Sequence, residues 1–331
     1  MNLKKIKKTF IIAEIGNNHE GSFDIACKLI MEAKKAGVDA VKFQTFKTKN
    51  FINSSKKERF DKLKRFELSY KDFEKLSILA KKNGLKFIST PLDIESAIFL
   101  NKIVNYFKIA SGDNNYFELI KKVLSFNKPT FISTGLLDFK EIKILLKYIK
   151  SLRFNLSKLS FLHCVSDYPV TYNCANLLSI KYLKDKLPLT IGYSDHTIGQ
   201  EAAIASVILG AKIIEKHFTL SNNFSDFRDH QISLNPQNMK KLVDSIRFNE
   251  LMLGHYEKKT QNCEKKNIKL MRRSIYASKN IKAQQLIKNT CIQVLRPFEV
   301  FEPNFVNKII GTRLKKNIFK NKPFQKKHFF K

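Results

Sequence analysis

The sequence predicts a (β/α)8 barrel, or TIM barrel, followed by a small β-rich domain. Eight short apolar segments alternate with longer segments in which apolar residues recur at helical spacing. Each apolar segment ends in polar or charged residues that can do chemistry, as barrel strands do at their carboxyl ends. The chain has 331 residues, enough for a barrel of roughly 250 residues and a small domain. The expected strands are 10–16, 40–46, 86–92, 106–112, 130–135, 158–164, 189–195 and 212–219.

The domain boundaries follow from a change in composition and apolar periodicity late in the chain. A long amphipathic helix is expected at 236–253, and Gly254 would end it. Residues 255–271 are polar and charged without clear periodicity, which predicts a linker. Residues 272–331 contain short β-like runs and frequent turns. We therefore expect a barrel domain over 1–254, a linker over 255–271 and a small β-rich domain over 272–331.

The formal net charge of +32 makes nucleic acid the first partner to consider. The lysines, however, are spread over the expected helix faces along the whole chain. They are not accompanied by the aromatic–glycine pattern of an RNA-binding sheet or by a zinc-finger spacing. This distribution predicts no specific nucleic-acid partner. Attraction of small anionic substrates explains the positive charge more simply than binding of nucleic acid does.

The sequence also predicts where the protein works. It has no run of 18 apolar residues, so no membrane span is expected. Glu14 interrupts the first apolar run, and no small-residue cleavage site follows, which argues against a signal peptide. The five cysteines are scattered and form no C-x-x-C pair, as is typical of free thiols in a reducing compartment. A cytoplasmic location is expected.

Two lysines at strand ends predict an anion site. Lys42 and Gln44 lie two residues apart on one strand and therefore point to the same face. Lys108 lies on another strand, and a lysine on a buried strand is costly unless an anion or a carboxylate meets it. Each lysine could pair with an internal carboxylate. Two lysines with a ring of hydroxyls favour a ligand bearing phosphate and carboxylate groups. The hydroxyls are those of Thr90, Ser111, Ser133 and Ser194.

Two histidines at neighbouring strand ends predict a metal site. His196 follows the seventh expected strand, and Glu215 and His217 share one face of the eighth. Two imidazoles beside a carboxylate suit a divalent metal of the manganese, iron and zinc group. The alternative is that each histidine is a hydrogen-bonded core residue. Glu14, on the first strand, is either an acid/base or the partner of a lysine.

Eight ordered motifs resemble those of the sialic acid synthase family. They are A-E-I-G-x-N-H-x-G at 13–21, V-K-F-Q at 41–44, S-T-P at 89–91, K-I-A-S-G-D at 108–113, S-T-G at 133–135, H-C-x-x-x-Y-P at 163–169, G-Y-S-D-H-T at 192–197 and E-K-H-F-T at 215–219. Arg273-Ser274 and Arg296-Pro297 are similar to parts of that family's C-terminal antifreeze-like (SAF) domain. The resemblance covers nearly the whole chain.

The resemblance implies an activity and partners. It implies condensation of phosphoenolpyruvate with an N-acetylated hexose and water, giving a nine-carbon 2-keto acid and phosphate in surface polysaccharide biosynthesis. His196 and His217 would bind a divalent metal, Mn²⁺ by resemblance, and Glu14 would handle protons. The family's architecture implies a domain-swapped homodimer in which Arg296 enters the partner's pocket. The implied phosphoenolpyruvate ligands are Lys42, Thr90, Lys108, Ser111, Ser133, Ser166 and Ser194. The implied sugar ligands are Gln44, Asp113, Tyr168, Asp229 and Arg296.

Two departures from the family pattern leave the acceptor open. Phe298 stands where the arginine loop usually has glycine, and Phe227-Arg228 replaces Gly-Pro before Asp229. The acceptor is therefore N-acetylmannosamine or a 2,4-diacetamido-trideoxyhexose, the latter giving legionaminic or pseudaminic acid. Two other functions compete: a related synthase acting on a phosphorylated aldose, and a basic binding module without turnover.

Overall fold

The computed structural model describes residues 2–329 and divides the chain into two compact units, Met1–Gly254 and His255–Lys331. The division falls where helix α11 (Pro236–Leu253) ends. Gly254 follows this helix with a φ of 54° and a ψ of −128°, a positive-φ conformation that glycine adopts without strain. Within residues 2–329, no helix combines the length and hydropathy needed to cross a membrane.

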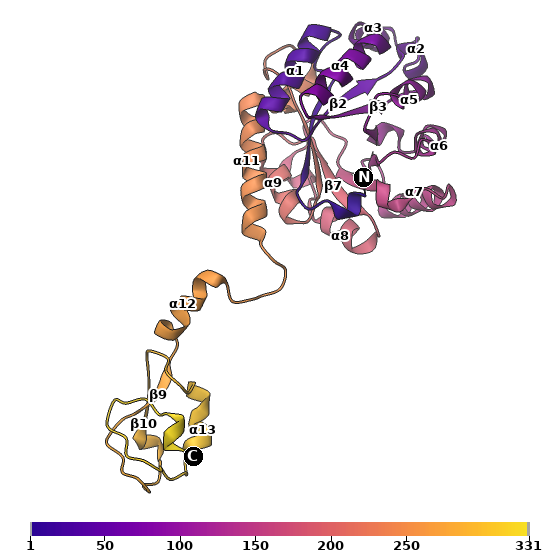
Figure 1. The fold of residues 1–331 in the computed structure, drawn as a ribbon. Coiled ribbons are helices and arrows are strands. Elements are labelled where there is room, and N and C mark those ends of the chain that lie inside the picture. The colour runs from indigo at the N-terminus through magenta and orange to yellow at the C-terminus, as the bar shows by residue number, and fades with distance from the viewer. Residues whose placement is uncertain (1, 330–331) are drawn as a thin grey trace. The chain divides into compact units, whose positions relative to one another are not determined.

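The first unit is a closed barrel of eight parallel strands in sequence order, which confirms the predicted TIM-barrel fold (Figure 1). All eight strands form within the segments expected from the sequence. They are β1 (Phe10–Gly16), β2 (Ala40–Thr45), β3 (Lys86–Pro91), β4 (Tyr106–Ile109), β5 (Thr130–Ser133), β6 (Leu159–Cys164), β7 (Thr190–Asp195) and β8 (Ile213–His217).

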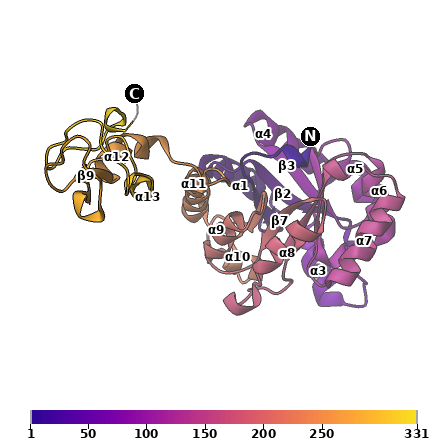
Figure 2. The ribbon, with the colours of Figure 1, turned by 90° about the horizontal axis from the view of Figure 1, so that it is seen from below.

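Helices surround the strands on all sides (Figures 1 and 2). Their apolar faces pack on the barrel, and several begin at side-chain caps, such as Ser22 on α1 and the reciprocal Ser69–Asp72 pair on α4. Besides α11, the helices are α1 (Phe23–Ala36), α2 (Thr48–Phe51), α3 (Lys57–Phe66), α4 (Tyr70–Lys82), α5 (Ile94–Leu100), α6 (Phe117–Ser125), α7 (Phe139–Ser151), α8 (Leu178–Lys186), α9 (Glu201–Ile208) and α10 (Arg228–Ile232).

The two ends of the barrel interior differ in chemistry. At the amino end, Tyr106 and Phe131 stack with ring centroids 5.5 Å apart and close the interior together with Phe10. At the carboxyl end, the register places Glu14 beside both Lys42 and His217. Because parallel strands end on the same rim, the reactive side chains gather at one end only.

The second unit is small and has little regular structure. Its β9 (Ser274–Ala277) and β10 (Ile292–Leu295) form an antiparallel pair over a core that includes Ile275, Leu314 and Phe324. A short helix, α13 (Val306–Ile309), follows. The expected linker at 255–271 is helical in its second half, α12 (Asn262–Met271). This helix buries none of its residues, so no contact with a core marks it as part of the fold.

Candidate active site

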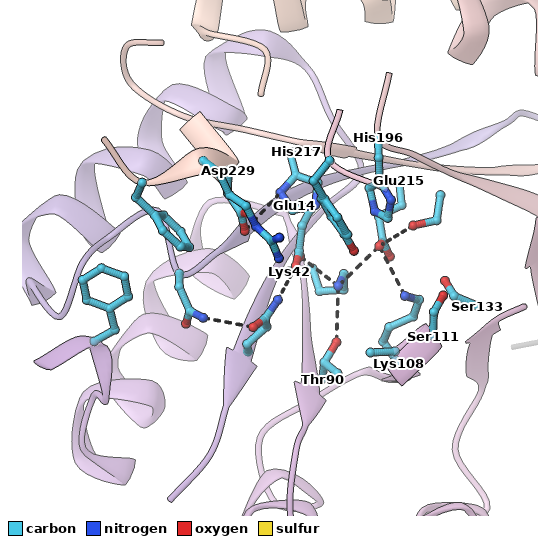
Figure 3. A pocket seen from close by; sticks show the side chains of 18 of the residues that line it. Glu14, Lys42, Thr90, Lys108, Ser111, Ser133, His196, Glu215, His217 and Asp229 are labelled. Atoms are coloured by element: carbon cyan, nitrogen blue, oxygen red, sulfur yellow. Dashed lines mark hydrogen bonds and ion pairs between the residues drawn. The ribbon is translucent and has the colours of Figure 1, made fainter. Parts of the chain in front are cut away.

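A cavity of about 630 Å³ opens at the carboxyl end of the strands (Figure 3). Every strand contributes to its wall or borders it, as the barrel geometry requires. Most of the site residues expected from the sequence line this single cavity. They are Glu14, Lys42, Gln44, Thr90, Lys108, Ser111, Ser133, Tyr168, Ser194, His196, His217 and Asp229.

Both buried lysines are paired with carboxylates. The Lys42 Nζ atom lies 2.9 Å from Glu14 Oε2 and 3.4 Å from Glu215 Oε1. The Lys108 Nζ atom lies 3.3 Å from the same Glu215 oxygen. Internal pairing, the less favoured alternative in the sequence argument, is therefore what the structure shows. Glu215, expected only as a neighbour of the histidines, joins the two lysines.

The two carboxyl groups titrate differently. Burial raises the pKa of Glu14 to about 6, although Lys42 acts in the opposite direction. Burial would also raise the pKa of Glu215, but Lys108 and Lys42 outweigh it and lower that pKa to about 2. Two interacting groups whose pKa values are pushed apart can take different roles in one reaction. Glu215 stays ionised and holds the lysines, while Glu14 can exchange protons near neutral pH.

The hydroxyl groups of Ser111 and Ser166 lie close to the backbone of Gly135, which has no side chain, and near Lys108. A Cβ atom at Gly135 would clash with Ser166 Oγ and Ser111 Oγ. The Ser133 and Ser166 hydroxyl oxygens are buried and have no hydrogen-bond partner within residues 2–329. Buried hydroxyls without partners are costly, so this arrangement is suited to an oxyanion that accepts their hydrogen bonds.

The two histidines lie next to each other on the cavity wall and meet edge to face, with ring centroids 5.4 Å apart (Figure 3). His196 Nδ1 lies 2.9 Å from the carbonyl oxygen of Val165, which places the proton on Nδ1 and leaves Nε2 with a free lone pair. His217 Nδ1 is buried without a hydrogen-bond partner among the described residues, and Asp229 Oδ2 lies 3.9 Å from it. Burial also lowers the pKa of His217 well below its usual value, which favours the neutral imidazole that metals bind.

These donors fit a divalent metal in part. Two imidazoles, one of them oriented by a backbone carbonyl, are suitable nitrogen ligands when neutral. Burial lowers the pKa of His196, but Cys164, the carbonyl of Val165 and Glu215 outweigh it and raise that pKa, so a metal bound here would displace a proton from His196. No group of three His, Cys, Asp or Glu side chains within residues 2–329 is arranged to hold a metal ion. A metal bound by His196 and His217 would therefore complete its coordination with substrate or water oxygens.

Comparisons with known proteins identify the family. The NeuB family profile matches residues 29–258. N,N'-diacetyllegionaminic acid synthase from Campylobacter jejuni is 39% identical over 88% of this chain and 91% of the relative. This chain belongs to the NeuB family. The sialic acid synthase resemblance seen in the motifs is thereby confirmed.

Two further NeuB relatives agree in sequence and in fold. Pseudaminic acid synthase from Campylobacter jejuni is 34% identical over 96% of this chain and 95% of the relative. The crystal structure of N-acetylneuraminic acid synthetase from Leptospira borgpetersenii, in complex with citrate, superposes with a TM-score of 0.75. That structure is 34% identical and covers 79% of this chain and 90% of its own.

Three expected site residues of this NeuB chain lie outside the cavity wall. Asp113 follows β4 in a short turn, where burial raises its pKa to about 6 although Lys108 opposes the change. Ser166 borders a neighbouring cavity between α7 and α8 while its hydroxyl faces Gly135. Arg296 belongs to the second unit, exposed directly after β10.

Several lining residues were not expected from the sequence. Asn17 lies in the turn after β1, inside a motif that was noted for other residues. A second group comes from α2 and α3, between β2 and β3, where the rule that strand ends hold the chemistry gives no signal. This group consists of Phe51, Arg59, Lys62, Leu63 and Phe66.

Proposed function

We propose that the protein condenses phosphoenolpyruvate with an N-acetylated amino sugar and water, giving a nine-carbon sialic-type 2-keto acid and phosphate. The NeuB relatives are named as synthases of such acids, at up to 39% identity over most of both chains. The observation that most supports the proposal is the group of serine hydroxyls at Gly135 beside Lys108. It offers phosphoenolpyruvate both hydrogen-bond donors and a positive charge.

The ligand assignments of the proposal follow the chemistry of the wall. Lys42 and Lys108 would meet the carboxylate and phosphate groups of phosphoenolpyruvate. Hydroxyl groups around them would donate to its oxygens, which makes positioning and charge stabilisation part of the folded site. The proposed hydroxyl ligands are Thr90, Ser111, Ser133, Ser166 and Ser194.

The proposed reaction has two stages. C3 of phosphoenolpyruvate attacks the aldehyde carbon of the open-chain sugar, and the aldehyde oxygen takes a proton to become a hydroxyl. C2 then takes up water. One proton of this water replaces the proton that the aldehyde oxygen took up. The other proton is transferred to the departing phosphate as the C2 hydroxyl becomes the 2-keto group. Glu14, 2.9 Å from Lys42 and with a pKa of about 6, is placed to exchange these protons.

His196 and His217 are the proposed ligands of a divalent metal, Mn²⁺ by family resemblance. When bound, the metal supplies a Lewis acid for the aldehyde oxygen. Tyr168 stacks on His196 with ring centroids 4.2 Å apart, and the neighbouring carboxylate of Asp229 lies 3.9 Å from His217. The stacked Tyr168 ring holds the His196 imidazole in place, and both Tyr168 and Asp229 line the cavity where the sugar would bind.

The rest of the proposal concerns the acceptor and the assembly. Gln44, Asp113, Tyr168 and Asp229 would contact the sugar. The second unit would be an antifreeze-like domain, and its exposed Arg296 would enter the pocket of a partner subunit in a homodimer. The support is the motif resemblance around Arg296 and the small β-rich core of this unit.

The test is phosphate release from phosphoenolpyruvate, with Mn²⁺ and a panel of acceptors. We expect release only when an N-acetylated hexose is present, loss of release with a chelator, and recovery on adding Mn²⁺. Formation of the 2-keto acid should match the phosphate released. Release with phosphorylated aldoses alone would support the related synthase, and no release with any acceptor would contradict the proposed reaction.

A further inference from the structure

We propose that the acceptor end of the cavity is a preformed subsite for an acetamido group and a terminal methyl group. This subsite consists of Asn17, Phe66 and Phe227. It would favour a 2,4-diacetamido-trideoxyhexose, which ends in a methyl group, over N-acetylmannosamine, which ends in a hydroxymethyl group. The inference rests on the proposed function, because it assumes that an amino sugar binds in this cavity.

The position of the subsite follows from the two ends of the cavity. The hydroxyl groups proposed for phosphoenolpyruvate lie at Ser111 and Ser133, and Asp229 lies at the opposite side of the view in Figure 3. Phe227 lines the cavity two residues before Asp229. A sugar whose aldehyde reaches the lysines and histidines would therefore direct its far end towards Phe227.

The far wall carries an apolar patch formed by two phenylalanines, although charged residues line the cavity around it. Phe66 and Phe227 meet edge to face, with ring centroids 5.2 Å apart and planes at 77°. Phe51 and Leu63 also line the cavity. A methyl group placed against the two rings would leave water for an apolar surface, whereas a hydroxyl there would lose its water without gaining a partner from either ring. The wall therefore favours a deoxygenated sugar terminus.

One polar atom in this region lacks a partner. Asn17 is 5% exposed, and its Nδ2 donates to Gln44 Oε1 at 3.0 Å. Its Oδ1 is buried and accepts no hydrogen bond from any residue between 2 and 329. An unpaired buried acceptor is costly, and the N–H of an acetamido group would satisfy it. Gln44 in turn donates to Glu14 at 3.5 Å, which connects this atom with the proposed reaction centre.

Contacts between three segments hold the subsite in shape. Gly21, with a φ of 83°, packs so closely on the carbonyl oxygen of Arg65 that a Cβ atom would clash there. Glu20 accepts hydrogen bonds from Ser225 and, at 3.2 Å, from His230 Nε2. These contacts join the turn after β1, the end of α3 and the loop before α10, so the wall exists before the sugar binds.

Cations at the cavity mouth raise an alternative, a phosphorylated acceptor. Arg59, Lys62 and Arg228 all line the mouth, and all are exposed. The Arg228 Nε atom lies 3.5 Å from Asp229 Oδ1, and the Arg228 guanidinium lies over the ring of Tyr168. The Lys62 Nζ atom lies over the ring of Phe227. Exposed cations, such as these three, gain little from pairing with a solvated anion. We therefore favour the apolar wall, and the test includes the phosphorylated sugar.

The test compares kcat/KM for three acceptors at saturating phosphoenolpyruvate with Mn²⁺: the diacetamido-trideoxyhexose, N-acetylmannosamine and its 6-phosphate. We expect the deoxy sugar to be preferred by about tenfold to a hundredfold, the range seen for small apolar discriminations. Phe227→Ala should remove most of this preference without changing the KM for phosphoenolpyruvate. Phe248→Ala, at a position 63% exposed on α11, is the matched control and should keep it. Equal use of the acceptors, preference for either other sugar, or an unchanged preference in Phe227→Ala would overturn the inference.

A binding measurement separates this inference from the proposed reaction. Saturation-transfer NMR on the intact protein with the deoxy sugar should show the strongest transfer to its methyl protons, and Phe227→Ala should reduce it. That result without turnover would contradict the reaction and leave the subsite standing. Turnover without methyl saturation would overturn the subsite alone.

Discussion

Glu215 determines the charge balance of the cavity, because one of its oxygens lies within 3.4 Å of both Lys42 Nζ and Lys108 Nζ. Ser194 also donates to this oxygen at 3.0 Å. Removing the carboxylate would leave the two ammonium groups with Glu14 alone, and Glu14 is itself held partly neutral by burial. Breaking a buried pair in this way leaves an uncompensated charge.

Glu215→Gln should therefore lower the free energy of unfolding by about 3–5 kcal/mol, the usual range for one lost partner of a buried pair. Urea unfolding followed by circular dichroism measures the change. Glu118→Gln, at an exposed position in α6, is the matched control and should stay within about 0.5 kcal/mol of wild type. Equal stability of the two variants would show that Glu215 does not compensate the lysines.

Glu14 should make stability depend on pH in a defined window. Its pKa rises from 4.5 to about 6 on folding, so the folded state binds more protons than the unfolded state between these values. The contribution of neutral Glu14 is fully present below pH 4.5 and is lost as pH rises to about 6. The loss is about 2 kcal/mol.

The measurement is urea unfolding of wild type and Glu14→Gln at several pH values from 4 to 7. Because glutamine does not titrate, the stability of wild type relative to the variant should fall across the window of pH 4.5 to about 6 and then become constant. Parallel curves, or a difference that grows with pH, would place the pKa of Glu14 at or below its ordinary value.

At this scale the sequence predicted the residue types and missed their pairing. Lys42 and Lys108 were identified because each lies on an expected buried strand. Each is also followed within a few residues by another polar side chain at the end of that strand. Their shared carboxylate is on β8, across the barrel from Lys108 on β4. Contacts across a closed barrel depend on its register and on side-chain direction, which local sequence patterns do not specify.

Among the elements, the loop after β5 is the one on which phosphoenolpyruvate binding should depend most. The hydroxyls of Ser111 and Ser166 come together there only because Gly135 has no side chain. A methyl group at this position would push them apart or occupy the place of the anion. The strands themselves need not move, since Gly135 follows the end of β5.

Gly135→Ala should therefore raise the KM for phosphoenolpyruvate by about tenfold to a hundredfold, equivalent to losing one charge-assisted hydrogen bond, with unchanged circular dichroism. Gly112→Ala is the matched control, because it lies in the turn after β4 and a Cβ atom there meets nothing within 4 Å. Similar KM values for both variants would remove Gly135 from the account of anion binding.

The elements show why some predictions succeeded and others did not. The barrel strands were recognisable because each is buried on both faces and ends in polar residues. The helix α12 was not, because none of its residues is buried. The contribution of α3 was also missed, because its cavity residues lie on an added helix between β2 and α4 rather than at a strand end.

At the scale of the whole molecule, the proposed function gives Arg296 of the second unit a role in an active site. Arg296 is exposed after β10, in a unit with its own core. The proposed homodimer would place Arg296 in the partner's cavity. The sequence suggested this arrangement only through family resemblance, because composition and periodicity do not encode which subunit a domain serves.

Subunit mixing tests the proposed swap. Arg296→Ala and Lys42→Ala homodimers should each be inactive, one lacking the donated arginine and the other lacking a phosphoenolpyruvate ligand. After subunit exchange, a mixed dimer of the swapped kind has both lesions in one site and leaves the other site whole. Random exchange should thus restore about one quarter of the wild-type activity. If Arg296 served its own barrel, every site would keep one lesion and the mixture would stay inactive. A covalent crosslink that confirms exchange, together with a wild-type plus Lys42→Ala mixture as the reference, makes either result decisive.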